Sequence, residues 1–297
     1  MININILGNG TLMYAIRTLL EVNQNQFKDD IRVNCFGDYY FSRSMVYALN
    51  NYLTIKDVVS QADIVICTDP KFEDDDIVTV CAEQSKPLFC TFPLEHKKSY
   101  KNALILDGLN VENAASDLWI NRILDVTENV VEIEHFYGLS KLYETGDNAL
   151  PGITAEEYRE ATQHVDGQPR LIWLGSSARY FYAQEIFEEK EDDVTVSYNW
   201  LIDTDQIDAS KIDLQTEFIF HTVIKINDGK TTTIKRSQMS CQDNRTISAW
   251  FYINACVVCS FIYMYHHNQC PTSYQDYNLI DHSVFSDNVF GARFRVA

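Results

Sequence analysis

The first 38 residues constrain the fold of this chain more than any other stretch. Residues 2–7 alternate isoleucine with asparagine and end at a leucine, which is the pattern of a short β-strand. The turn Gly8-Asn9-Gly10 follows at once, and leucine and isoleucine recur at helical spacing through 11–22. A second apolar strand, 31–36, is followed by a glycine and then by Asp38. This order of elements predicts the first half of a Rossmann-type dinucleotide-binding domain.

The residues of this turn suit a pyrophosphate. Gly8 allows a tight turn off the strand, and Gly10 has no side chain to hold the backbone away from a ligand. Thr11 begins the helix, whose free N–H groups and dipole favour an anion. Asp38 can accept hydrogen bonds from ribose hydroxyls and would repel a 2′-phosphate, so NAD(H) is favoured over NADP(H). Arg43, a little further along, favours the opposite preference.

The glycine motif is incomplete, because its third glycine position holds Met13. A glycine there normally lets the helix pack closely on the strand. We therefore expect either a shifted helix or a methionine side chain that lies over the cofactor. A Rossmann-type domain that no longer binds a nucleotide is the alternative.

Further strand–helix units follow this first half. A strand at 62–68 ends at Thr68 and Asp69, and in such sheets the ligand lies beyond the carboxyl ends of the strands. These two residues are candidates for the cofactor cleft, although an Asp-Pro pair equally suits the start of a loop. A short helix is predicted at 44–52, and the repeating units predict a first domain over 1–125 with a parallel sheet.

The second half has a different pattern, which predicts an α+β domain over 126–297 with an open, largely antiparallel sheet. Strands are expected at 130–136 and 170–174, and a hairpin over 218–236. The apolar helix 247–265 is suited to packing back on the first domain. The remaining segments are a polar excursion at 139–168, with one helix at 154–163, and an irregular tail at 271–297. The whole chain is therefore expected to be an α/β protein of two domains.

Composition argues against several classes of function. The formal net charge is −18 and no Lys/Arg cluster stands out, which argues against nucleic-acid binding. No apolar run reaches the ~20 residues that cross a membrane. Met1 leads straight into the first strand, so no signal peptide is predicted and a cytoplasmic location is expected.

Eight cysteines raise the question of a metal site. Cys256-x-x-Cys259 is followed by His266, His267 and Cys270, which is a conceivable zinc set. The first pair lies inside an apolar helical run, where cysteine behaves as a small hydrophobic residue. Buried, reduced thiols are therefore expected, and no metal is predicted.

The chain resembles the saccharopine dehydrogenase-like oxidoreductases and, more specifically, the opine metallophore dehydrogenases. The resemblance spans residues 1–180 and rests on the order of five short stretches. They are Ile6-Leu-Gly-Asn-Gly10, Val65-Ile-Cys-Thr68, Leu104-Ile-Leu-Asp-Gly-Leu-Asn110 with Ala114-Ala-Ser116, His135-Phe-Tyr-Gly138, and Arg170-Leu-Ile-Trp-Leu-Gly-Ser-Ser177. The last stretch continues with Ala178-Arg179, where the family tends to have a histidine.

The resemblance implies a nicotinamide-dependent reduction of an amino-acid-like substrate. An amine and the carbonyl of a 2-oxo acid condense to an imine, and hydride transfer gives a secondary amine that bears a carboxylate. His135 suits the donation of a proton or the orientation of the imine, and Ser177 and Arg179 suit a substrate carboxylate. Each has an ordinary alternative: a core histidine, a turn serine and a surface arginine.

Two other functions stay open. A non-catalytic Rossmann-fold nucleotide sensor, or a partner subunit of a biosynthetic cluster, is favoured by Met13 in the glycine motif. A sugar-type oxidoreductase of similar build usually carries a Lys-Pro pair where this chain has Phe92-Pro93, which ranks it lower. A homodimer formed through the open sheet is also expected.

Overall fold

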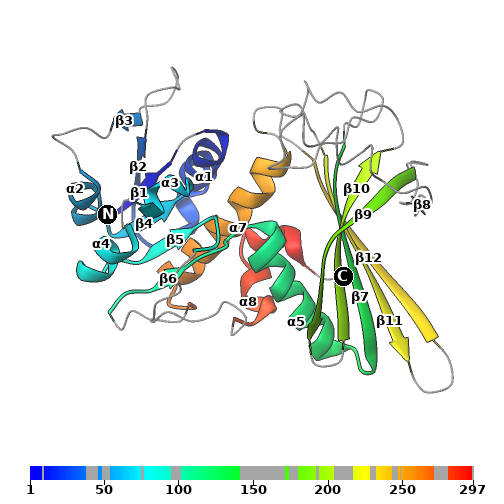
Figure 1. Ribbon diagram of the computed structural model, residues 1–297. Helices are drawn as coiled ribbons and strands as arrows, with labels where there is room; N and C mark the ends of the chain where they lie inside the picture. Colours follow the sequence, from blue (N-terminus) through cyan, green and yellow to red (C-terminus); the bar gives the residue numbers. More distant parts are fainter. Residues whose placement is uncertain are drawn as a thin grey trace. The chain divides into compact units, whose positions relative to one another are not determined.

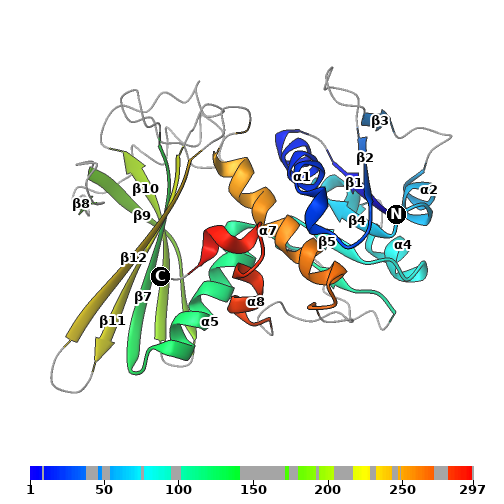
Figure 2. The ribbon, with the colours of Figure 1, turned by 180° about the vertical axis from the view of Figure 1, so that it is seen from behind.

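The computed structural model divides into two compact units, Met1–Arg122 with Phe251–Arg295, and Ile123–Trp250. Each unit is built on one sheet, which the ribbon diagrams show from two sides (Figures 1 and 2). The structure describes residues 1–8, 10–37, 46–48, 54–74, 77–94, 102–140, 171–173, 180–191, 194–203, 217–227, 232–242, 247, 249–270 and 280–295.

The first unit contains a parallel sheet of the kind that the sequence predicts. Its described strands are β1 (Ile2–Leu7), β2 (Ile31–Gly37), β3 (Val46–Ala48), β4 (Ile64–Cys67), β5 (Leu88–Cys90) and β6 (Ile105–Leu106). They lie in the order β3-β2-β1-β4-β5-β6, and every pair is parallel. The chain builds outward in one direction from β1 and then in the other from β4, which is the strand order of a Rossmann-type sheet. The predicted fold class is confirmed.

One local prediction is wrong. Residues 44–52 were expected to contain a short helix, but Val46–Ala48 form β3, which pairs with Cys35–Gly37 of β2. The edge of β2 offers backbone hydrogen bonds to this segment. That tertiary pairing outweighs a weak helical pattern of side chains.

Helices cover both faces of the sheet. α2 (Ile55–Ser60), α3 (Lys71–Asp74) and α4 (Ile77–Glu83) enclose one apolar cluster with the sheet. α1 (Thr11–Val22) and α7 (Ala249–His266) lie on the other face (Figures 1 and 2). There the Cys259 thiol donates to the Ile16 carbonyl, and Phe89 of β5 meets Tyr265 edge to face. Because β1 is central, its Asn5 is buried as well, and its amide donates to the Val58 carbonyl at 2.7 Å.

The C-terminal segment is more ordered than the sequence suggests. The tail 271–297 was expected to be irregular, but its described part, 280–295, forms α8 (His282–Ser286) and a 3₁₀ turn, Gly291–Phe294. Three phenylalanines of this segment are buried, which makes it part of the core: Phe285, Phe290 and Phe294. The correction has a simple cause, because phenylalanines spaced along short turns do not produce a long helical period.

Asn288 fastens this segment to α7. Its amide donates to the Ser260 hydroxyl at 2.7 Å and to the Phe285 carbonyl at 2.8 Å. Its carbonyl oxygen accepts from the N–H groups of Phe290 and Gly291 at 3.0 and 2.9 Å. A buried side chain that satisfies backbone groups on two sides is expensive to remove, because each partner then loses its hydrogen bond.

We predict that Asn288→Leu lowers the free energy of unfolding by about 2–4 kcal/mol, because buried donors and acceptors lose their partners. Urea denaturation measures the change. The neighbouring Val289 is exposed, so Val289→Ala should change stability by about 0.5 kcal/mol or less. Equal effects of the two substitutions would contradict a fastening role for Asn288.

The second unit contains the open, largely antiparallel sheet that the sequence predicts. Its described strands are β7 (Val130–Ser140), β8 (Leu171–Trp173), β9 (Tyr180–Glu191), β10 (Val194–Asp203), β11 (Glu217–Asn227) and β12 (Thr232–Gln242). They lie in the order β12-β11-β7-β10-β9-β8. The β7–β10 pair is parallel and the others are antiparallel. The predicted hairpin is confirmed as β11 and β12, whereas β9 and β10 were not anticipated. The predicted helix 154–163 lies outside the described residues.

Candidate functional site

The carboxyl ends of the parallel strands meet at one edge of the first unit. In the register of the sheet, Leu7 at the end of β1 stands opposite Phe36 of β2 and Cys67 of β4. Cys67 in turn stands opposite Cys90, the last residue of β5. The segments that follow these strands therefore begin side by side. This is the edge at which open parallel sheets bind ligands.

Backbone hydrogen bonds tie these segments together across the edge. The N–H groups of Gly8, Thr68 and Thr91 each donate to a backbone carbonyl at or next to the end of the neighbouring strand. Their acceptors are the carbonyls of Phe36, Leu7 and Cys67, at 2.9, 2.9 and 3.0 Å. The loops are thus extensions of the sheet ladder, which gives the edge a fixed shape.

Gly8 is required by the packing of the protein itself. A Cβ atom at this position would overlap the Thr68 hydroxyl, which lies directly against the turn and donates to the Leu7 carbonyl at 3.5 Å. The sequence places both residues at the site, and the structure brings them into contact. A role for Gly8 in fitting Thr68 does not by itself require a ligand.

Gly10 is required for a different reason. Its φ of +85° is a conformation that residues with side chains rarely adopt, while, apart from its two chain neighbours, no described residue has an atom within 4 Å of where its Cβ would be. It caps α1 without a side chain, so the first N–H groups of the helix, beginning at Thr11, have no capping side chain at that residue. The first turn also contains no acidic residue. A helix N-terminus of this kind favours an anion such as a pyrophosphate.

Met13 does not lie over this space. Its side chain is 3% exposed and belongs to the buried face of α1. The flexible thioether occupies the position where a third glycine would allow the closest packing, and methionine adapts well to such gaps. Of the two outcomes expected from the sequence, a methionine side chain over the cofactor is therefore not what the structure shows.

We predict that Gly8→Ala lowers stability by about 1–3 kcal/mol, because the new methyl group overlaps Thr68. Thr68→Ala should recover part of that loss in the double variant, with a coupling energy of about 1 kcal/mol by urea denaturation. Gly10→Ala is the matched control, because its cost comes from backbone strain alone. Its effect should add to that of Thr68→Ala, and coupling in this second pair would contradict the explanation.

Asp69 has a local structural role in addition to its place at the site. Its Oδ1 accepts from the Lys71 N–H at 3.1 Å, and its carbonyl accepts from the Phe72 N–H at 3.2 Å. These bonds begin α3. The sequence left open whether this residue lines the cleft or starts a loop; the structure shows that it starts a helix at the edge of the sheet.

The structure adds three polar residues that the sequence analysis did not select. Thr91 follows β5, and Asp107 and Asn110 follow β6. The Asp107 carboxylate accepts from the Leu94 N–H at 2.8 Å, and the Asn110 amide donates to the Thr91 carbonyl at 2.9 Å. A usable signal was present, because polar residues directly after a strand had already selected Thr68 and Asp69.

His135 lies in the sheet of the second unit. Its side chain is 0% exposed, its Nδ1 lies 3.0 Å from the Thr222 hydroxyl, and its ring is tilted against Tyr198. The three residues occupy one row across β11, β7 and β10. Burial lowers the pKa of His135 to about 3, so the imidazole is neutral at pH 7. Its catalytic role stays a prediction.

We predict that His135 makes the protein sensitive to acid. The folded-state pKa is about 3 and the unfolded value about 6.5, so the unfolded chain binds more protons between these limits. Stability should therefore fall as pH falls below about 6.5, by about 1.4 kcal/mol per pH unit for this group.

Urea midpoints between pH 7 and pH 5 measure this slope. His135→Gln should reduce the slope, whereas Thr222→Val should lower stability at every pH and leave the slope in place. An unchanged slope in His135→Gln would contradict the assignment.

The histidines at the end of α7 differ from each other. The His266 Nε2 accepts from the Lys28 N–H at 3.0 Å, and burial lowers the pKa of this histidine. The dipole at a helix C-terminus favours an imidazolium, but the accepted hydrogen bond requires a neutral nitrogen at His266. The Nδ1 of His267 lies 2.9 Å from the Tyr263 carbonyl, near the end of the helix.

The described part of the chain holds no group of three His, Cys, Asp or Glu side chains that could bind a metal ion. The seven cysteines whose side chains the structure describes are free thiols, and all of these except Cys270 are buried. Within the same residues, no helix has both the length and the apolar character needed to span a membrane. Three predicted site residues, Asp38, Ser177 and Arg179, lie outside the described residues, as does Arg43.

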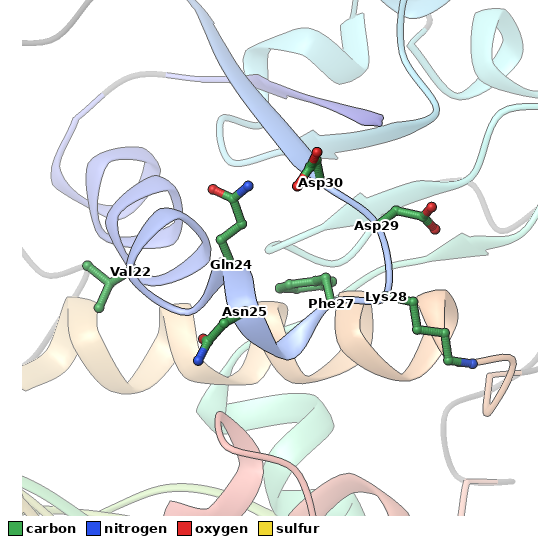
Figure 3. A pocket seen from close by; sticks show the side chains of 7 residues that line it. All are labelled: Val22, Gln24, Asn25, Phe27, Lys28, Asp29 and Asp30. Carbon is green, nitrogen blue, oxygen red and sulfur yellow. The ribbon is translucent and has the colours of Figure 1, made fainter.

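A surface pocket lies away from this edge. Its volume is about 510 Å³, and it is lined by the connection from the end of α1 to the start of β2 (Figure 3). Its lining residues are Val22, Gln24, Asn25, Phe27, Lys28, Asp29 and Asp30. Because these residues follow the end of α1 and precede β2, the pocket belongs to the amino edge of the sheet. It contains none of the predicted site residues.

Two solved structures resemble this chain closely in fold. Saccharopine dehydrogenase (L-Glu forming) from Saccharomyces cerevisiae matches 97% of this chain and 96% of its own, with a TM-score of 0.65 and 9% sequence identity. An engineered D-amino acid dehydrogenase matches 97% of both chains, with a TM-score of 0.53 and 10% identity. The chain has the fold of these dehydrogenases. The saccharopine dehydrogenase-like architecture expected from the sequence is thereby confirmed.

At these identities the likeness concerns the fold. No protein-family model matches the sequence, and a sequence comparison with curated proteins finds no relative.

Proposed function

We propose that this protein is an NAD(H)-dependent oxidoreductase that acts on a carbon–nitrogen bond of an amino-acid-like substrate. The observation that carries the proposal is the N-terminus of α1, which begins at Thr11, after the cap residue Gly10, beside the carboxyl ends of β1 and β4. A pyrophosphate there would accept hydrogen bonds from the first N–H groups of the helix. Apart from its two chain neighbours, no described residue crowds the Cβ position of Gly10, which supports this placement.

We assign the two halves of the dinucleotide to the two halves of the sheet. Gly8, Gly10 and Thr11 would hold the pyrophosphate, and Asp38 after β2 would accept hydrogen bonds from the adenosine ribose. The nicotinamide half would then lie toward β4 to β6, near Thr68 and Asp69. A carboxylate at the ribose favours NAD(H) over NADP(H).

The reaction class rests on the fold and on the resemblance of the sequence. An amine and a 2-oxo acid lose water to form an imine. When bound, the reduced nicotinamide supplies the hydride to the imine carbon, and a proton completes the secondary amine. Ser177 and Arg179 are proposed to bind the carboxylate. His135, which is neutral at pH 7, is better suited to orienting the imine than to donating its proton.

The burial of His135 also supports a second candidate, a non-catalytic Rossmann-fold protein that senses a nucleotide or serves as a partner subunit. In either case we propose a cytoplasmic protein that can pair through the open sheet of its second unit.

We predict that NADH binds more tightly than NADPH, measured by energy transfer from tryptophan to the nicotinamide during titration. Asp38→Asn should narrow the preference roughly tenfold, the effect of losing one charge-assisted hydrogen bond. Asp30→Asn is the matched control. Asp30 precedes β2 at the amino edge of the sheet, so the same loss of charge there should leave the preference unchanged.

A folded protein that binds neither nucleotide would overturn the dinucleotide site. A protein that binds NADH but does not oxidise it in the presence of any tested pair of amine and 2-oxo acid would favour the non-catalytic candidate. A preference for NADPH would move the ribose-reading role from Asp38 to Arg43.

A further inference from the structure

A polar side chain from the C-terminal helix reaches the edge of the parallel sheet. Asn254 lies in α7, most of whose neighbouring side chains are apolar and buried, and it is itself 3% exposed. Its Oδ1 accepts from the Val111 N–H at 2.9 Å, across 143 positions of sequence. Burying an amide costs free energy unless it is hydrogen-bonded, so its place here calls for a reason beyond packing.

The partner of Asn254 begins an unusual turn. Residues Val111–Ala115 form one π-helical turn ahead of α5 (Ser116–Val126), with Asn110 as the cap residue. The N–H group at the start of a helix has no partner within the helix, and here Asn254 provides one. At the other end of the turn, the Ser116 hydroxyl donates to the Val111 carbonyl at 2.6 Å. Single π-turns are frequent at functional sites.

The same turn is joined to the loops at the carboxyl edge. Asn110 accepts from the Asn113 N–H at 2.8 Å, and its own amide donates to the Thr91 carbonyl at 2.9 Å. The Gly108 and Leu109 N–H groups donate to residues that follow or end β5. The segment 107–113 is therefore held on one side by the end of β5 and on the other by α7. Both views show α7 running next to β5 (Figures 1 and 2).

We propose that Asn254 is a positioning residue that holds the segment 107–113 against the nicotinamide half of the dinucleotide site. This inference rests on the proposed function. The segment follows β6, in the half of the sheet that the strand order assigns to the nicotinamide, while the adenosine half lies across the switch point on β2. Removing the acceptor frees the π-turn at its first residue. The adenosine half keeps all its contacts.

The test compares two ligands, NADH and ADP-ribose, that differ by the dihydronicotinamide ring. Asn254→Leu keeps the size of the side chain and leaves the Val111 N–H without its acceptor. It should weaken NADH binding roughly tenfold and leave ADP-ribose binding, measured by calorimetry, within about twofold. Asn254→Asp keeps an acceptor oxygen at the same place and should restore NADH affinity.

Ser260→Ala is the matched control. Ser260 lies on the same helix, is equally buried, and donates to the Phe285 carbonyl in the C-terminal segment rather than to the π-turn. It should lower thermal stability in the same manner as Asn254→Leu and leave the affinity for both ligands unchanged.

Equal weakening of NADH and ADP-ribose in Asn254→Leu, or weakening of NADH in Ser260→Ala, would overturn the positioning role. Unchanged NADH affinity in Asn254→Leu would overturn it too, with the dinucleotide site intact. If the parent protein binds neither ligand, the proposed function fails and takes this role with it.

Discussion

The parallel pairing of β1 with β2 on one side and β4 on the other is the constraint on which the rest of the first unit depends. The register of these pairs fixes the ends of the three strands relative to one another. Leu7 stands opposite Cys67, so the turn after Leu7 and the segment after Cys67 begin side by side at the same edge of the sheet. The Thr68 hydroxyl then lies against Gly8, and α1 begins directly after Gly10 with its free N–H groups at the same edge. A slip of one residue in this register would turn every side chain of β1 to the opposite face.

Buried asparagines connect the elements that this sheet brings together. Asn5 joins the central strand to α2 and also accepts from the Asn34 amide, Asn288 joins the C-terminal segment to α7, and Asn254 joins α7 to the π-turn. An amide both donates and accepts, so one side chain can satisfy backbone groups on two elements at once. Apolar packing alone would allow these elements to slide, whereas paired amides specify a single arrangement.

Predictions of secondary structure from the sequence were correct for segments whose residue pattern is local. The strand, the glycine turn and the helix at the start, and the Asp-Gly hairpin, are local features whose periods and turn residues survive in the fold. Gly10 was predicted for the close approach of a ligand, and the structure adds a separate reason for glycine there, a φ of +85°. The prediction for 44–52 failed where the partner, β2, lies elsewhere in the chain.

Other features could not be obtained from the sequence because they depend on residues far apart. No neighbouring residue in the sequence indicates that Thr68 fills the space over Gly8, and none indicates the hydrogen bond between Val111 and Asn254. The place of His266 at the end of a helix alone would favour a positive charge. Burial against Phe27 lowers its pKa instead, despite Asp29 at 3.8 Å, and its Nε2 accepts from the Lys28 N–H. A helix end predicts a charge only while the side chain stays in water.

The buried ionisable groups differ from the polar groups at the carboxyl edge of the parallel sheet. His135 is neutral because its sheet excludes water, and several cysteines have pKa values raised by burial, among them Cys81 and Cys259. None of these groups is poised to exchange a proton near pH 7. At the carboxyl edge, by contrast, the described side chains are amides, hydroxyls and carboxylates held by backbone N–H groups, such as Asn110 and Asp107. Such groups are suited to binding and orienting a ligand, and the proposed reduction, which would take its hydride from a bound nucleotide, would need little else from the protein there.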